Sequence, residues 1–185
     1  MGIPPAATRE SIASLRENEL KEACRHLHIT QLHLLGFRDK TLEIQPMDHL
    51  VKRVLLLLRA EQPASVLTFH ERLGGHPDHC TIGKAATLAF AEYKKDNPFA
   101  RLFFVAWPAF AKDPEKHGLL GEQLMQVDIS EKRVQKLKAF RAHKTQSDMN
   151  DWVWGDDQAA IAAMDPVEWF IQAEPPFDPN QNSLV

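Results

Sequence analysis

Apolar residues recur three and four positions apart in several stretches of this chain, a spacing typical of helices with one buried face. In the first stretch, Ile12, Leu15 and Ala23 lie near one face, and charged residues occupy the other. Pro46 can open the second stretch, and Ser130 is a good N-cap for the last. The pattern predicts helices over residues 11–27, 46–61, 80–95 and 131–143.

Shorter apolar runs alternate with these helices and predict strands. The run at 101–106 is almost continuously apolar, as expected of a strand buried on both faces. Further strands are expected at 31–35, 66–69, 124–129 and 168–173. Because strands and helices alternate, the sequence predicts an α/β, Rossmann-like layered fold with a mainly parallel sheet flanked by helices.

Composition and charge narrow the class of protein. The length of 185 residues favours a single domain, expected over 1–174, followed by a flexible tail at 175–185. Basic and acidic residues are interleaved and sum to a formal net charge of -3, so no nucleic-acid partner is expected. The apolar runs are too short for a membrane span, and no secretory signal is visible. Cys24 and Cys80 form no spacing motif, which favours a reducing, cytoplasmic location.

The run Gly74-Gly75-His76-Pro77-Asp78-His79 carries the candidate chemistry. It lies between the predicted strand at 66–69 and the helix from 80, and open α/β sheets bind ligands at the carboxyl ends of their strands. Two histidines with a carboxylate between them can place imidazoles at one cleft. Two plainer interpretations remain: His76 and His79 as polar loop residues, and Asp78 as a helix N-cap.

Six segments follow one another in order along the chain: Met1-Gly2 with Thr8-Arg9-Glu10, Arg16-Glu17-Asn18-Glu19-Leu20, Leu35-Gly36-Phe37-Arg38-Asp39-Lys40-Thr41, Gly75-His76-Pro77-Asp78-His79, Val127-Asp128-Ile129-Ser130 and Arg141-Ala142-His143-Lys144-Thr145-Gln146. Together they resemble the PIG-L/LmbE family of zinc-dependent N-acetylglucosaminyl deacetylases, and most closely its bacillithiol-biosynthesis branch. The resemblance runs over roughly residues 1 to 146, and six ordered matches are far more specific than one short motif.

The resemblance implies a role for individual residues. His79 matches the last of three zinc ligands, and His76 matches the residue that stabilises the oxyanion or acts as general acid. Asp78 matches the carboxylate that orients His76. Arg16 matches an arginine that faces the substrate, although an exposed arginine paired with Glu19 is an equal alternative. His143 is expected to support the pocket wall rather than to bind metal.

The chain departs from the family at its N-terminal side. The family's AHPDDE-type motif carries a His and an Asp ligand and the general base, and no residue here matches it. The first βα unit is therefore expected to be missing. Three explanations stay open: a start codon placed too late, a truncated gene, or a degenerate member without metal. With His79 as the one clear ligand, weak or absent zinc is expected, because catalytic zinc sites use three protein ligands.

The resemblance implies an enzyme that removes acetyl from an N-acetylglucosaminyl conjugate, with the malate conjugate of bacillithiol synthesis as the specific expectation. The partner is then a small N-acetylated amino-sugar substrate, and zinc is the cofactor. A homo-oligomer is also expected, since an open strand edge can pair with another chain. The alternative is a non-catalytic sugar- or partner-binding remnant of the same family that lacks the metal site.

Overall fold

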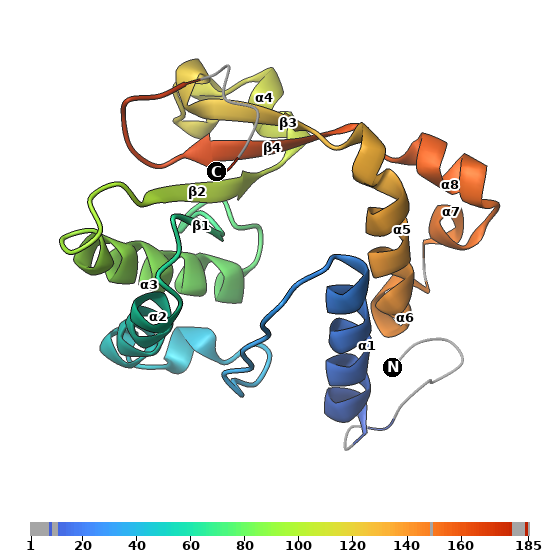
Figure 1. Cartoon of the computed structure of the whole chain (residues 1–185), viewed down its shortest axis with the longest axis horizontal. Helices are drawn as coiled ribbons and strands as arrows, with labels where there is room; N and C mark the ends of the chain where they lie inside the picture. Colours follow the sequence, from blue (N-terminus) through green and yellow to red (C-terminus); the bar gives the residue numbers. More distant parts are fainter. Residues whose placement is uncertain (1–7, 9–10, 149, 179–183, 185) are drawn as a thin grey trace. The chain divides into compact units, whose positions relative to one another are not determined.

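The structure is a computed structural model that describes residues 8, 11–148, 150–178 and 184 (Figure 1). Internal contacts divide the chain into two compact units. Unit 1 comprises residues 1–35 and 129–166, and unit 2 comprises residues 36–128 and 167–185. The single domain expected over 1–174 stays a prediction. The matching pieces Met1-Gly2 and Arg9-Glu10 lie outside the described residues.

Unit 2 contains a four-stranded sheet in the order β1-β2-β4-β3. β1 and β2 are parallel, whereas β4 runs antiparallel to both β2 and β3. The α/β class is confirmed, but the expectation of a mainly parallel sheet is wrong. The strands are β1 (Ser65–Thr68), β2 (Arg101–Ala106), β3 (Leu124–Asp128) and β4 (Val167–Gln172).

The mixed sheet has a topological cause. Between β1 and β2 the chain passes through one helix, α3 (Pro77–Tyr93), which forms the crossover that parallel neighbours need. Between β3 and β4, by contrast, residues 129–166 form part of unit 1. The chain then returns as β4 between β2 and β3. The alternation of strands and helices along the sequence therefore predicted the parallel pairing of β1 and β2 correctly. It failed for β4, which pairs antiparallel with both of its neighbours.

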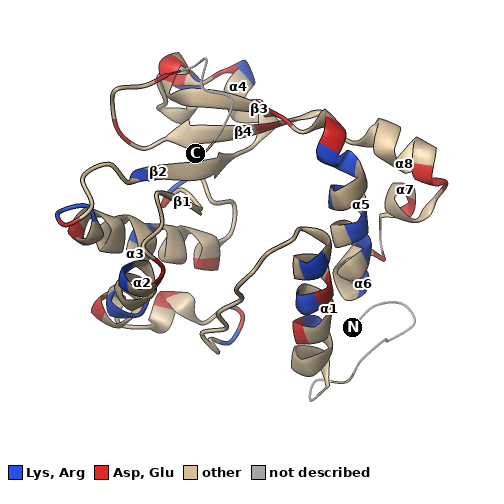
Figure 2. Cartoon of the chain, in the orientation of Figure 1, with Lys and Arg blue, Asp and Glu red and all other residues tan. Residues whose placement is uncertain are grey.

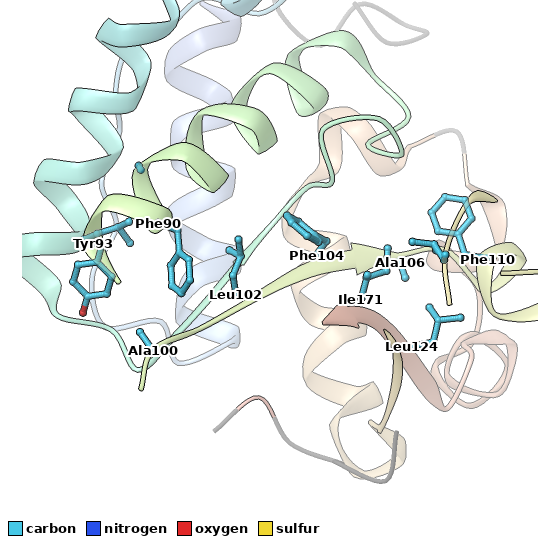
Figure 3. Close-up of a cluster of buried hydrophobic side chains, with 12 residues drawn as sticks. Phe90, Tyr93, Ala100, Leu102, Phe104, Ala106, Phe110, Leu124 and Ile171 are labelled. Atoms are coloured by element: carbon cyan, nitrogen blue, oxygen red, sulfur yellow. The ribbon is translucent and has the colours of Figure 1, made fainter. Parts of the chain in front are cut away.

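One face of the sheet packs against α3 and α2 (Met47–Glu61), which lie side by side in Figure 1. Figure 3 shows Phe90 and Tyr93 of α3 facing side chains from the strands. Tyr93 is 1 % exposed, and its hydroxyl donates to the carbonyl oxygen of Pro63 at 3.1 Å. The buried members of this core are Leu58, Ala89, Phe90, Tyr93, Ala100, Leu102, Phe104, Ala106, Phe110, Leu119, Leu124 and Ile171.

The opposite face of the sheet carries a smaller cluster of Phe103, Met125 and Phe170, against which Leu184 packs. At the end of β4, buried Gln172 accepts a bond from Arg101 Nη2 at 2.7 Å. The Gln172 side chain also exchanges hydrogen bonds with the backbone of Asp178. These contacts hold the described start of the segment that was expected to be a flexible tail, and the rest of that segment lies largely outside the described residues.

Unit 1 is helical. Its second half forms a core from Leu137, Val153, Ala160 and Met164, and α1 contributes buried Ala23 and Cys24. Figure 2 shows basic residues along α5, whereas α1 carries both signs. The helices are α1 (Ile12–His26), α5 (Arg133–Ala142), α6 (Lys144–Ser147), α7 (Asp151–Trp154) and α8 (Asp157–Ala163).

Short elements complete the chain: α4 (Pro108–Lys112) and the 3-10 turns η1 (Leu42–Ile44), η2 (Glu115–His117), η3 (Gly121–Gln123) and η4 (Ser130–Lys132). Ser130 begins η4 rather than capping α5, so that expectation was wrong. The segment 31–35 forms no strand, so that expectation was wrong. No described helix has the length and apolar character that crossing a bilayer requires.

Candidate functional site

The turn between β1 and α3 brings the candidate histidines together. His76 is the N-cap of α3, with extended backbone (φ -140°, ψ 143°), and Pro77 occupies the first turn. Proline suits that position because its missing N–H would have no partner there. The helix therefore starts at Pro77 rather than near Cys80, and His76 rather than Asp78 is its cap.

His76 and His79 lie one helical turn apart, and their ring centroids are 5.3 Å from each other. The ring of His79 stacks face to face on Phe69, with a centroid distance of 3.9 Å and an interplanar angle of 2°. Phe69 directly follows β1, so the end of the strand sets the orientation of the His79 imidazole. Both histidines thus lie at the carboxyl end of β1, as the sequence predicted.

Backbone hydrogen bonds distinguish the two imidazoles. His79 Nδ1 lies 3.1 Å from the carbonyl oxygen of Gly74. A carbonyl can only accept, so Nδ1 carries the proton and the lone pair is on Nε2. In His76, Nδ1 accepts from the backbone N–H of Asp78 at 3.1 Å, so neutral His76 carries its proton on Nε2. One turn therefore presents an acceptor nitrogen on His79 and a donor nitrogen on His76.

The carboxylate of Asp78 bonds to backbone groups of unit 2, and its expected role in orienting His76 stays a prediction. It is 7 % exposed and accepts from the backbone N–H groups of Lys40 and Leu42, at 2.6 and 3.1 Å. The bond that reaches His76 comes from the backbone of Asp78. The carboxylate therefore ties residues 40–42, at the start of η1, to the start of α3, within unit 2.

Glycines allow the close packing around this turn. Gly75 has φ +75°, a left-handed conformation that favours glycine. A Cβ at Gly74 would lie 3.1 Å from the Cβ of His79 and from the carbonyl oxygen of His70. A Cβ at Gly83 would lie 2.2 Å from the carbonyl oxygen of Phe69, so α3 approaches the end of β1 as closely as backbones allow.

The sequence analysis missed two residues beside the turn. Trp107 directly follows β2 and is 46 % exposed, and its Nε1 lies 3.9 Å from where a Cβ of Gly75 would be. An aromatic residue at the end of the neighbouring parallel strand was the available signal. The second residue is His70, which directly follows Phe69.

His70 is half-buried and closes the chain after β1. Its Nδ1 accepts from the backbone N–H groups of Arg72 and Leu73 at 3.1 and 3.3 Å, and its ring contacts Phe104 edge to face at 5.0 Å. Burial, followed by the positive charge of Arg72, lowers the pKa of His70 from 6.5, and Glu71 opposes that shift. The neutral ring is the form that accepts both backbone bonds.

The two other predicted site residues, Arg16 and His143, belong to unit 1. Arg16 is exposed on α1, and its expected alternative partner Glu19 is instead buried, at 8 % exposure. The Glu19 carboxylate accepts from the backbone N–H and the hydroxyl of Thr145 at 2.8 and 2.6 Å. His143 lies between α5 and α6 and lines a pocket of about 290 Å³ with Phe140, Gln146, Ser147 and Asn150.

Residues 2–90, which include the turn and Arg16, match the family model of the GlcNAc-PI de-N-acetylases, PIG-L. The chain carries a PIG-L family segment. The matched residues include the whole β1–α3 turn. The family predicted from the order of motifs is confirmed for this segment.

Three curated relatives bear the printed name "Probable N-acetyl-alpha-D-glucosaminyl L-malate deacetylase 2". Those from Bacillus cereus and Bacillus subtilis are 34% identical to this chain over 149 and 148 residues, 80% of the chain and 64% of each relative. The one from Bacillus anthracis is 36% identical over 146 residues, 79% of the chain and 62% of the relative. The chain thus spans a little under two thirds of their length. No solved structure matches significantly.

Proposed function

We propose that this chain is part of an N-acetylglucosaminyl deacetylase, an amide hydrolase. The observation that carries the proposal is the pair of opposite imidazole tautomers at the turn, within the segment that matches PIG-L. The names of the Bacillus relatives support an N-acetylglucosaminyl substrate, with the malate conjugate as the specific choice. Hydrolysis of an amide needs a donor for the developing oxyanion and a proton for the departing amine.

His76 is the residue that we assign to proton donation. Nδ1 of His76 accepts a hydrogen bond from the Asp78 backbone, and this bond orients the ring. The other nitrogen, Nε2, carries the proton and can donate it to a substrate. In the neutral form it donates a hydrogen bond to an oxyanion, and in the protonated form it delivers a proton to the amine. Asp78 acts as a positioning residue, because its backbone N–H orients His76 and its carboxylate holds residues 40–42.

His79 is the residue that we assign to zinc. The Nδ1–H bond to Gly74 leaves Nε2 unprotonated, which is the arrangement that metal-binding histidines usually have. The donor set is nevertheless incomplete: among the described residues, no three His, Cys, Asp or Glu side chains gather as a metal site requires. The residues described here therefore do not fit a whole zinc centre, and His79 accounts for one ligand of it.

The position of β1 supports a source for the other ligands. Within the described sheet β1 is an end strand, paired only with β2. A further strand paired in parallel at its other edge would end beside His76 and His79, because parallel strands share their carboxyl ends. Such a strand can come from a longer chain or a second copy, so the proposal includes self-association through this edge.

Arg16 and His143 keep the roles that the resemblance implies, substrate contact and support of the pocket wall. Arg16 is exposed on α1, and a guanidinium suits a carboxylate such as that of malate. The location that we propose is the cytoplasm. The support for it is that Cys24 and Cys80 are both free thiols, as is usual in a reducing compartment.

The proposal is tested by joining a family N-terminal segment, with its AHPDDE-type motif, ahead of Met1. Zinc content and amine release from an N-acetylglucosaminyl substrate are measured together. We expect His79→Ala to abolish zinc binding, and His76→Ala to keep zinc but slow turnover by roughly two to four decades. His26→Ala, on the surface of α1, is the matched control and should change neither quantity.

The assignment of the pair is wrong if both variants lose zinc equally, or if His76→Ala keeps full activity. Without the joined segment we expect weak or no zinc binding. Tight stoichiometric zinc in that protein would show further ligands, and Asp78 and His143 would be examined first.

A further inference from the structure

The loop between α3 and β2 carries the most exposed large apolar side chain among the described residues. Phe99 is 94 % exposed, compared with 79 % for Ile44 and 64 % for Leu56. The loop directly precedes β2 and adjoins the end of β4, which runs antiparallel to β2. It therefore lies at the opposite end of the sheet from the turn with His76 and His79, and the proposed hydrolysis gives Phe99 no role.

Hydrogen bonds hold this loop against the end of α3. The backbone N–H of Asn97 donates to the carbonyl oxygen of Lys94 at 3.2 Å, and its side-chain amide donates to that of Tyr93 at 3.3 Å. The N–H of Ala100 donates to the carbonyl oxygen of Asn97 at 3.0 Å. Because the loop is already held, a partner that covers Phe99 loses little free energy to ordering it.

Two hollows adjoin Phe99, and each has room for an aromatic ring. Their volumes are about 460 and 310 Å³, and Pro98, Phe99 and Ala100 line both of them. A cavity of about 150 Å³ already admits a benzene ring. Pro175 and Pro176 give the larger hollow a stiff wall. One surface, which we call the Phe99 patch (residues 94–102 and 172–178), thus combines a protruding ring with a hollow that can receive one.

The charges around the larger hollow balance. Lys94 and Arg101 contribute two positive charges, and Glu174 and Asp178 contribute two negative ones. Lys94 and Glu174 form an ion pair. A partner with a strong charge of either sign gains nothing from such a surface. A two-fold rotation instead sets the ion pair antiparallel to its own copy, so each ammonium lies toward a carboxylate of the partner, and the patch is complementary to itself.

We propose that two copies of this chain associate through the Phe99 patch, with Phe99 of each protomer in the larger hollow of its partner. Because ring and hollow are adjacent on one surface, the contact pairs the patch with itself and closes as a dimer rather than a filament. An aromatic side chain seated in a pocket is the kind of residue that carries most of the binding energy of an interface. No residue of β1 and neither histidine of the turn takes part.

The test measures the mass of the chain as it is, without any added segment. Sedimentation velocity over about 1–200 µM protein detects a dimer whose Kd is about 100 µM or tighter, and we expect such a dimer. A photoreactive phenylalanine analogue at position 99 localises the contact. In the covalent dimer it should be joined to residues 172–178 of the second copy.

Variants at exposed positions measure the contribution of each group. Phe99→Ser should raise the Kd by at least about 30-fold, the factor for one residue that dominates an interface. Glu174→Arg gives both facing patches a net positive charge and should raise the Kd by about 3- to 10-fold. Leu56→Ser on α2 and Glu43→Arg in η1, which line neither hollow, are the matched controls and should dimerise as the parent does.

Three results would overturn the proposal. The first is a chain that stays monomeric throughout the concentration range. The second is a dimer that Phe99→Ser leaves unchanged, since the copies would then meet through another surface such as the edge of β1. The third is a cross-link from position 99 to residues outside the patch. None of these results bears on the hydrolase proposal, because zinc content and amine release there depend on His76 and His79.

Discussion

Each unit buries one carboxylate among its described residues and uses it in the same way, but the polar atoms nearby differ. Asp78 of unit 2 accepts from Lys40 and Leu42, more than thirty positions earlier in the chain. Glu19 of unit 1 accepts twice from Thr145, which is 126 positions later. Beside Asp78, one nitrogen of each histidine is bonded to the backbone, whereas beside Thr145 two buried polar atoms have no bond among the described residues.

The two regions differ in whether their polar side-chain atoms are bonded to the backbone. At the β1–α3 turn, backbone bonds occupy one nitrogen of each imidazole and so determine which proton state the other nitrogen presents. Around Thr145 in unit 1 the framework is equally well bonded, but two buried atoms, His143 Nδ1 and Ser147 Oγ, have no partner in the described part of the chain. The first arrangement determines which nitrogen of each imidazole can donate or accept, and the second leaves two buried polar atoms without a bond among the described residues.

The largest effect is expected from removing the two buried carboxylates. Asp78→Ala and Glu19→Ala should each lower the free energy of unfolding by about 2–4 kcal/mol, because each leaves two donors without a charged acceptor. Urea denaturation measures the loss. Hydrogen exchange localises it, since the amides of Lys40 and Leu42 should lose protection in one variant and that of Thr145 in the other.

Exposed carboxylates provide the control for both variants. Asp48→Ala and Glu17→Ala each remove a surface pair, with Lys52 and Lys21, and should cost about 0.5 kcal/mol or less. If either buried carboxylate proves as dispensable as its exposed control, its role as an anchor between distant segments is wrong.

A smaller effect is expected from pH at His70. Because its pKa in the folded chain is lowered from 6.5, the unfolded chain binds more protons once the pH falls below that value. Stability should therefore be constant above pH 6.5 and fall as the pH decreases toward the folded pKa. The substitution His70→Asn keeps an acceptor near the Nδ1 position for Arg72 and Leu73 but does not titrate.

Urea denaturation at several pH values between about 5 and 8 distinguishes the two proteins. The parent should lose more stability on acidification than the His70→Asn variant does. Equal slopes would mean that protonation of His70 is not coupled to folding. His117→Asn, which replaces a ring packed on Phe110 and has no such backbone bonds among the described contacts, serves as the control.

The smallest effect is expected at Ser147. Without a ligand, Ser147→Ala removes a buried hydroxyl that has no partner among the described residues, so it should leave stability unchanged or raise it by about 0.5–1 kcal/mol. Thermal unfolding measures the change. A clear destabilisation without ligand would show that the hydroxyl already has a structural partner, and the contrast between the two units would disappear.

Local features of the fold could be predicted from the sequence. The apolar spacing and Pro46 located α1 and α2 to within a residue or two, and the apolar run at 101–106 is β2. The run 31–35 has strand-like composition but no strand beside it among the described residues, so the prediction failed there. Composition reports what a segment favours, whereas a strand also needs a partner that only the fold can supply.

The sequence by itself determined the family segment, the four main helices and the place of His76 and His79 after β1, because these depend on residues close together in the chain. Only the tertiary structure decided the antiparallel insertion of β4, the partners of Asp78 and Glu19, the tautomers of the two histidines and the state of the buried polar atoms of His143 and Ser147. Each of these depends on which groups meet after the chain has folded. Hydrogen bonds between distant segments, or their absence, leave no pattern in a local stretch of residues.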